Sequence, residues 1–200
     1  MNRRDRKIKK KELEMILQRV YDFPDPKPEL EQYLTPASIA ADILFKAIEN
    51  IDGKKVVDLG CGTGIFAIGS ALLGADAVGV DIDEKAVERA ENFCAENGIN
   101  VRFVCSDISD FSERCDTVIM NPPFGAQRKH ADRKFMDKAI EIANVIYHLC
   151  LDGDFVERYY KDKSKETQKI GGYSFEIKHR FNFHTKDKRE YEVSLIKVIA

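Results

Sequence analysis

The sequence contains no tryptophan, and its 200 residues carry a formal net charge of only −2. No apolar run approaches the roughly 20 residues that a membrane span needs, so we expect no membrane insertion. The amino terminus, which reads M-N-R-R-D-R-K, lacks the apolar core of a secretory signal. Because the overall charge is nearly neutral, any nucleic-acid site must come from local clusters of basic residues.

Cysteine pairs with a C-x-x-C spacing are also missing. The five cysteines are spread along the chain as Cys61, Cys94, Cys105, Cys115 and Cys150. This pattern predicts neither a disulfide framework nor a zinc site, and reduced thiols in the cytoplasm fit it best. We assign no metal site, because the four histidines are equally scattered: His130, His148, His179 and His184.

The first 30 residues differ in character from the rest. Residues 1 to 20 carry eight Lys or Arg against three Asp or Glu, and their apolar residues recur at helical spacing. This predicts a basic amphipathic helix, which could pack on the domain or contact phosphates. The proline-rich stretch 22–29 predicts an extended connector. We therefore expect a helix and connector over 1–30 and one domain over 31–200.

From residue 37, helices and strands are predicted to alternate. The expected strands lie near 55–59, 77–81, 101–105 and 116–120, and the expected helices near 37–48, 64–73, 84–97 and 132–148. Such alternation indicates parallel crossover units, hence an α/β fold of Rossmann-like type with helices on both faces of a mostly parallel sheet. Two alternating runs, 173–183 and 191–199, predict an antiparallel hairpin at the end. The lysine-rich segment 150–172 indicates only a helix.

A glycine-rich loop joins the first strand to the first crossover helix. It reads D-L-G-C-G-T-G over Asp58 to Gly64, and glycines here let the backbone turn sharply and approach a ligand. Asp81 ends the next strand, where an acid can accept both ribose hydroxyls of a nucleoside. Asp107 follows the third strand and could meet an adenine amino group. All three points lie at carboxyl ends of strands, where ligands bind in open α/β sheets.

Two cofactors compete for this loop. The stretch 62–67 is compatible with the dinucleotide pattern G-x-G-x-x-A, so a nicotinamide-dependent oxidoreductase remains an alternative. The carboxylate of Asp58 would repel a pyrophosphate, whereas it could orient the positively charged amino acid end of S-adenosylmethionine. Charge therefore favours the sulfonium cofactor. A tight turn without any ligand is the third interpretation.

The run N-P-P-F at residues 121–124 follows the apolar strand near 116–120. Asn121 offers a side-chain carbonyl, Pro122 and Pro123 hold the backbone and leave carbonyl groups free, and Phe124 can stack on a ring. This corner suits the binding of a planar amino group, although a rigid turn closing a buried strand is the alternative. The basic stretch 127–134 beyond it is either a phosphate clamp or a solvated loop.

Together these residues resemble the class I S-adenosylmethionine-dependent methyltransferases. Asp58 to Gly64 looks like their first motif, Asp81 like the ribose-binding acid, and Asn121 to Phe124 like their N-P-P-[FY] amino-methylation motif. The runs E-Q-Y-L-T, G-V-D-I-D and D-T-V-I-M-N-P-P-F-G narrow the likeness to the methyltransferase-like protein 5 family. Members of that family are ribosomal RNA adenine-N6 methyltransferases with archaeal relatives.

The resemblance implies a seven-stranded sheet whose reversed strand comes from the last hairpin. It implies that Gln32 and Thr35 close over S-adenosylmethionine. The residues that would bind this cofactor are Gln32, Thr35, Asp58, Gly60, Gly62, Thr63, Gly64, Ile65, Asp81, Ile82, Asp107 and Ile108, and those that would take the target base are Asn121, Pro122, Pro123 and Phe124. The segment 150–172 matches the family poorly.

The expected function is methyl transfer to the exocyclic amino nitrogen of adenine in RNA, with ribosomal RNA as the expected partner. A protein glutamine methyltransferase is the alternative within the same chemistry, because an amide nitrogen is also planar. A non-catalytic subunit that keeps the fold is a further alternative. Eukaryotic members of the family need a small zinc-binding activator subunit, and the exposed sheet edge near Val101 to Cys105 is where a partner chain could pair.

Overall fold

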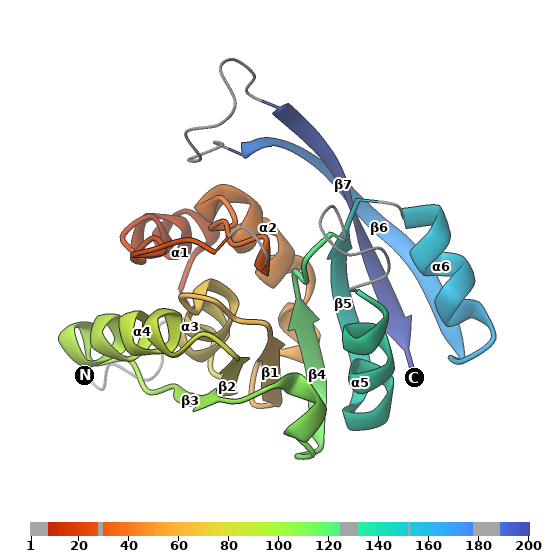
Figure 1. Cartoon of the computed structure of the whole chain (residues 1–200), viewed down its shortest axis with the longest axis horizontal. Helices are drawn as coiled ribbons and strands as arrows, with labels where there is room; N and C mark the ends of the chain where they lie inside the picture. Colours follow the sequence, from red (N-terminus) through yellow and green to blue (C-terminus); the bar gives the residue numbers. More distant parts are fainter. Residues whose placement is uncertain (1–7, 28–29, 125–131, 152, 178–188) are drawn as a thin grey trace.

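The computed structural model describes residues 8–27, 30–124, 132–151, 153–177 and 189–200. Its seven strands form one sheet in the order β3-β2-β1-β4-β5-β7-β6 (Figure 1). The first five strands run parallel, β7 is antiparallel to both β5 and β6, and the bounds are β1 Lys55–Leu59, β2 Asp76–Asp81, β3 Arg102–Cys105, β4 Cys115–Met120, β5 Ala143–Cys150, β6 Glu166–Ile177 and β7 Arg189–Ile199.

Helices cover both faces of this sheet. Their bounds are α1 Lys10–Leu17, α2 Ala37–Lys46, α3 Ile65–Leu72, α4 Glu84–Asn97, α5 Arg133–Ile142 and α6 Gly153–Lys161, with 3-10 turns η2 at Ile48–Asn50 and η3 at Ile108–Asp110. One apolar cluster joins α1 to α4 to the sheet, and a second cluster joins α5 and α6 to the opposite face. Because both faces are covered, central strands such as β1 are apolar without alternation. The predicted fold class is confirmed.

The amino-terminal helix α1 packs into the first of these clusters. Leu13 and Leu17 are fully buried there, and the side chain of Lys10 pairs with that of Asp42 on α2. The sequence left two interpretations for this helix, packing on the domain or contact with phosphates. Residues 10–17 pack on the domain. The basic residues 1–7 lie outside the described residues. No helix within the described ranges is both long and apolar enough to cross a membrane.

The prediction of one helix over 132–148 is wrong. The helix ends at Ile142, and the strand β5 begins at Ala143. The buried residues Phe135, Ala139, Ile142 and Ile146 keep a helical spacing across this boundary, because a strand buried on both faces shows no alternation that would mark its start. The β-branched residues of β5 were the one signal for a strand.

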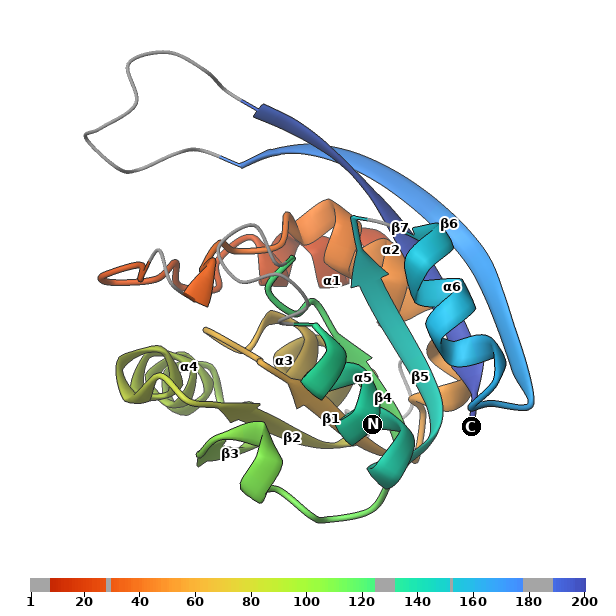
Figure 2. The ribbon, with the colours of Figure 1, turned by 45° about the vertical axis from the view of Figure 1, so that its right-hand side comes forward.

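The final hairpin is longer than predicted. Its first strand begins at Glu166, seven residues before the predicted start, so the lysine-rich segment 150–172 contains both α6 and half of β6. Figure 2 shows β6 and β7 as two long curved strands at one edge of the sheet, with α6 beside them. The sequence between the two predicted strands predicts a turn at 185–189; residues 178–188 lie outside the described residues, and residue 189 already belongs to β7. The hairpin supplies the reversed strand, as expected, because β7 runs antiparallel to β5; the structure places β7 between β5 and β6.

Candidate functional site

A cavity of about 270 Å³ opens at the carboxyl ends of β1, β2 and β4. Small-molecule sites commonly fall between about 300 and 1,000 Å³, so its size approaches that of a nucleoside site. Thirteen of the sixteen predicted site residues line it, namely Gln32, Thr35, Asp58, Gly60, Gly62, Thr63, Ile65, Asp81, Ile82, Asp107, Ile108, Asn121 and Pro123. Gly64, Pro122 and Phe124 are absent from its lining but adjoin residues that form it.

The glycine loop needs glycine at Gly62 for two reasons. Its φ of +52° lies in the left-handed region, which other L-residues adopt at a cost. A Cβ atom built on Gly62 would also lie 2.5 Å from Cζ of Phe23. The Phe23 ring, from the amino-terminal connector, therefore rests directly on the loop and forms part of the cavity wall.

Asp81 ties the loop to the end of β2. Its Oδ2 accepts a hydrogen bond from the backbone N–H of Gly62 at 2.7 Å, and its Oδ1 accepts one from that of Asp83 at 2.8 Å. Burial raises the pKa of Asp81, and these backbone bonds partly offset the effect. Each carboxylate oxygen has a second lone pair, so Asp81 can still accept from a ligand hydroxyl.

Asp58 is almost fully buried, with 1% of its surface exposed. One of its oxygens accepts a hydrogen bond from the backbone N–H of Ala67, in the first turn of α3, at 3.0 Å. Burial raises the pKa of Asp58 to about 8, and the nearby charge of Asp81 adds to the rise. A cationic group bound in this cavity would favour the ionised form of Asp58, so the site gains complementarity when it holds a positive ligand.

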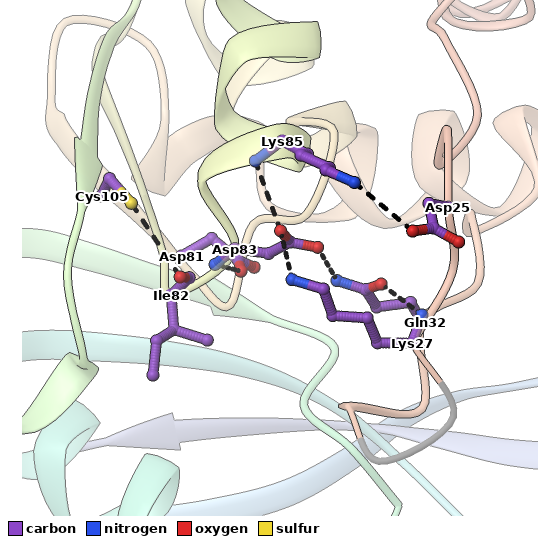
Figure 3. Close-up of polar contacts among 8 residues, drawn as sticks. All are labelled: Asp25, Lys27, Gln32, Asp81, Ile82, Asp83, Lys85 and Cys105. Atoms are coloured by element: carbon purple, nitrogen blue, oxygen red, sulfur yellow. Dashed lines mark hydrogen bonds and ion pairs between the residues drawn. The ribbon is translucent and has the colours of Figure 1, made fainter.

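Asp83, which follows Asp81 on the same turn, fastens the connector to the sheet. Its carboxylate accepts hydrogen bonds from Gln32 Nε2 and from Lys27 Nζ, each at 2.7 Å (Figure 3). Gln32 Oε1 in turn accepts from the backbone N–H of Lys27 at 2.8 Å. Burial alone would raise the pKa of Asp83, but the bonds from Gln32 and Lys27 lower it overall. Gln32 thus lines the cavity while its own side chain is held in place.

Asp107 lies at the other side of the cavity, with its pKa lowered first by the hydrogen bond from the backbone N–H of Ser109. Lys134 of α5 forms an ion pair with Asp107 at 3.2 Å. Phe135, the next residue of α5, comes so close to Gly60 that a Cβ there would lie 2.9 Å from its ring. The start of α5 therefore closes this side of the cavity.

The N-P-P-F corner meets the connector at the same cavity. Asn121 Oδ1 accepts a hydrogen bond from Tyr33 Oη, and Asn121 Nδ2 donates one to Thr35 Oγ1, both at 3.0 Å. The rings of Tyr33 and Phe124 lie 5.5 Å apart between centroids, with a tilt of 35°. The structure therefore places the predicted base-binding residues beside the predicted cofactor residues.

Several cavity residues had no predicted role: Phe23, Leu30, Glu31, Tyr33, Leu34, Cys61, Phe66 and Phe135. Tyr33 stands inside the quoted run E-Q-Y-L-T, where its position between two predicted residues was a usable signal. Phe23 and Phe135 come from elements that only the tertiary fold brings to the loop. The predicted phosphate clamp spans 127–134, of which 127–131 lie outside the described residues. Its last residue, Lys134, lies in the first turn of α5 and pairs with Asp107 in the cavity lining.

The cavity is acidic. Glu31, Asp58, Asp81 and Asp107 all line it, and Lys134 is the one cationic side chain in the lining that the described residues provide. Such a lining disfavours the pyrophosphate of a nicotinamide dinucleotide and suits a nucleoside that carries positive charge. The fold and the cavity together define a class I S-adenosylmethionine-dependent methyltransferase.

Comparison with known proteins agrees with this class. Residues 37–155 match the family described as "Methyltransferase small domain". The chain is 36% identical to the zebrafish (Danio rerio) rRNA N(6)-adenosine-methyltransferase METTL5, covering 95% of this chain and 98% of that protein. It is 42% identical to MJ0284 of Methanocaldococcus jannaschii, over 96% and 94% of the two chains.

Among solved structures, PH1948 from Pyrococcus horikoshii superimposes with a TM-score of 0.85 at 36% identity, covering 100% of this chain and 98% of that one. The chain belongs to the METTL5 family of methyltransferases. The resemblance read from the sequence motifs is thereby confirmed, and S-adenosylmethionine is the cofactor of this class.

Proposed function

We propose that this protein transfers a methyl group to the exocyclic amino nitrogen of adenine in ribosomal RNA. The observation that carries the proposal is the shared cavity, in which Asn121 and Pro123 face the same space as Asp58 and Asp81. A methyl donor at the glycine loop and an amino group at the corner would therefore be neighbours. Relatives named rRNA N(6)-adenosine-methyltransferase in zebrafish and in Drosophila melanogaster support RNA as the acceptor.

The proposed cofactor contacts follow from the chemistry of the lining. Asp58 would face the ammonium end of the cofactor, with Gly60, Thr63 and Ile65 along its methionine side. The hydroxyls of the ribose would meet Asp81, and Asp107 and Ile108 would meet the adenine. When bound, the cofactor would supply a methyl group activated by positive sulfur. Transfer would form an N–C bond as the C–S bond breaks with its electron pair going to sulfur, and the amino nitrogen would lose one proton to water.

The corner would supply positioning rather than a strong base. Asn121 Oδ1 and the carbonyl oxygen of Pro122 are two acceptors for the two amino hydrogens of the target base. Holding both hydrogens directs the nitrogen lone pair toward the methyl group, and positioning of this kind can provide much of the acceleration. Phe124 would stack on the extruded base, a contact worth about 1–3 kcal/mol.

A labelling experiment tests the acceptor. The protein is incubated with cofactor labelled in the methyl group and with either total RNA or a protein extract, followed by nuclease or protease treatment. The proposal requires label that nuclease releases and protease does not. Label that only protease releases would assign the chain to the amide-nitrogen methyltransferases instead. Asn121→Ala serves as the control that should incorporate about a hundredfold less label, or lower still, in either arm.

An activator subunit is the second part of the proposal. β3 lies at the edge of the sheet and pairs with β2 on one side, and its residue Cys105 is exposed. An unpaired strand edge can accept a strand from another chain, so a small zinc-binding partner would dock along Arg102–Cys105. The backbone N–H of Ser106 donates to Asp81 of β2, and N–H groups alternate in direction along a strand, so the N–H of Cys105 faces the open edge. Co-purification with such a partner should be lost when Cys105→Pro removes this donor. We also propose a cytoplasmic location, because thiols stay reduced in that compartment.

A further inference from the structure

The side-chain amide of Asn121 is held at both of its ends by one short segment. Tyr33 Oη donates to Asn121 Oδ1, and Asn121 Nδ2 donates to Thr35 Oγ1, each over 3.0 Å. These partners lie more than 80 residues away in the chain, two residues apart from one another. Each hydroxyl can donate or accept, and in the structure the two together hold the amide with Oδ1 toward Tyr33 and Nδ2 toward Thr35.

The same segment is anchored on the cofactor side of the cavity. Gln32, the neighbour of Tyr33, donates to Asp83 Oδ2 at 2.7 Å (Figure 3). The backbone N–H of Asp83 donates to Asp81, whose other oxygen accepts from the backbone of Gly62. A continuous set of hydrogen bonds therefore runs from the glycine loop to the segment that holds the Asn121 amide.

Tyr33 and Thr35 are placed to hold rather than to react. Thr35 has only 3% of its surface exposed, and the Tyr33 ring packs at a tilt against Phe124. Burial raises the pKa of Tyr33 well above its usual value, so its hydroxyl keeps the proton that it donates to Asn121. Both residues line the cavity.

We propose that Tyr33 and Thr35 are positioning residues, which fix the Asn121 amide with its carbonyl oxygen directed at the amino group to be methylated. This inference rests on the proposed amino-group methylation. A carbonyl oxygen has two lone pairs, so Oδ1 can accept from Tyr33 and from the substrate at once. A rotated amide would instead present N–H donors to the amino hydrogens of the acceptor, and transfer would stop.

Steady-state kinetics of conservative variants test this role. Thr35→Val keeps the shape but removes the acceptor for Asn121 Nδ2, and should lower kcat about tenfold or more because the Asn121 amide loses one of the two contacts that hold its orientation. Thr35→Ser restores that acceptor and should recover kcat to within about threefold of the original protein. Tyr33→Phe keeps the ring but loses the donor, and should lower kcat about fivefold.

The affinity for the cofactor separates this role from the one that the family resemblance implies for Thr35. We expect Thr35→Val to leave the cofactor Kd within about twofold while kcat falls. A large loss of cofactor affinity, with kcat unchanged at saturating cofactor, would assign Thr35 to cofactor binding and overturn the positioning role.

The chain contains matched controls for the loss of a tyrosine or a threonine hydroxyl. Tyr147→Phe removes a tyrosine oxygen that accepts from Asn50 Nδ2 at 2.8 Å, and Thr117→Val removes a threonine hydroxyl that donates to the Asn50 carbonyl at 2.6 Å. Neither residue lines the cavity. Both variants should unfold more easily and keep kcat. If they lower kcat as much as Tyr33→Phe and Thr35→Val do, the loss reflects general destabilisation and the inference is wrong.

A readout without substrate keeps the inference separate from the proposed function. The side-chain NH2 signals of Asn121 can be assigned in ¹⁵N-labelled full-length protein by their loss in Asn121→Ala. Thr35→Val and Tyr33→Phe should shift these signals and speed their exchange with solvent, whereas Thr117→Val and Tyr147→Phe should not. Unchanged Asn121 signals in Thr35→Val overturn the inference. If the signals shift but the protein methylates no RNA, the positioning role of Tyr33 and Thr35 stands and only the proposed adenine acceptor is refuted.

Discussion

Two groups of tyrosine, asparagine and threonine lie toward opposite ends of the strand β4. At the amino end, Asn50 donates to Tyr147 and accepts from Thr117 through its backbone. At the carboxyl end, Asn121 accepts from Tyr33 and donates to Thr35. No member of the first group lines the cavity, whereas all three members of the second do. The same chemical types thus stabilise the fold at one end and present an acceptor to a ligand at the other.

Truncating the two asparagines should give the largest contrast. Asn121→Ala should lower kcat by about 10²–10³-fold, as loss of one preorganised hydrogen-bonding group in an active site does, with near-normal cofactor affinity by calorimetry. Asn50→Ala should keep kcat and lose about 1–2 kcal/mol of unfolding free energy, because it leaves the buried Tyr147 hydroxyl unpaired. A lower kcat in Asn50→Ala than in Asn121→Ala would contradict the assignment of Asn121 to the reaction and of Asn50 to the fold.

Two glycines allow the same comparison, between a residue at the cavity and a residue away from it, to be made for the backbone. Gly62 and Gly98 both have positive φ, but a Cβ at Gly62 would meet the Phe23 ring and a Cβ at Gly98 would meet nothing within 4 Å. Gly98→Ala should cost about 1 kcal/mol of stability from its conformation alone. Gly62→Ala should also weaken cofactor binding roughly tenfold or more, since the ring must shift within the cavity. Equal cofactor affinities in the two variants would refute the ring contact.

The carboxyl end should also respond to pH. Asp58 has a pKa of about 8 in the free protein, so it is mostly protonated at pH 7. A cationic cofactor favours its ionised form and lowers this pKa, so binding releases a proton and affinity rises with pH until it levels off above about pH 8. Calorimetry in buffers of different ionisation enthalpy measures that proton. Asp58→Asn should release fewer protons, and equal release would exclude Asp58 as the source.

The smallest effect is expected at the solvent-exposed rim. Lys134 and Asp107 are 53% and 34% exposed, and exposed ion pairs contribute about 0–1 kcal/mol. Lys134→Gln should therefore weaken cofactor binding less than about threefold, with the difference vanishing at high salt. A loss above tenfold that persists in high salt would mean that Lys134 binds the cofactor directly.

The parallel half of the fold follows from local patterns in the sequence. The predicted bounds of β1 and α4 agree with the structure because turn residues and helix caps mark their ends. The boundary between α5 and β5 carries no such mark. The helix passes directly into the strand at Ile142 and Ala143 without a glycine or proline, and the buried positions keep a helical spacing across it. Tertiary burial, rather than local preference, makes β5 a strand.

The site could be predicted where its residues form contiguous motifs. The glycine loop and the N-P-P-F corner are continuous runs at strand ends, so their meeting in one cavity follows from the parallel topology. Phe23 and Phe135 could not be predicted, because each reaches the loop through packing between distant elements. Tyr33 and Thr35 reach Asn121 through tertiary contacts of their segment, among them the hydrogen bond from Gln32 to Asp83, which spans 51 residues.

The central claim is that adenine N6 meets the methyl donor at the Asn121 corner. Ribosomal RNA from cells that lack this protein can be treated with the purified protein and a deuterated methyl donor, digested to nucleosides and analysed by mass spectrometry. The account predicts deuterated N6-methyladenosine with the original protein and, in the same time, about a hundredfold less or lower still with Asn121→Ala. Deuterium in any other nucleoside, or in N6-methyladenosine formed equally well by Asn121→Ala, would contradict it.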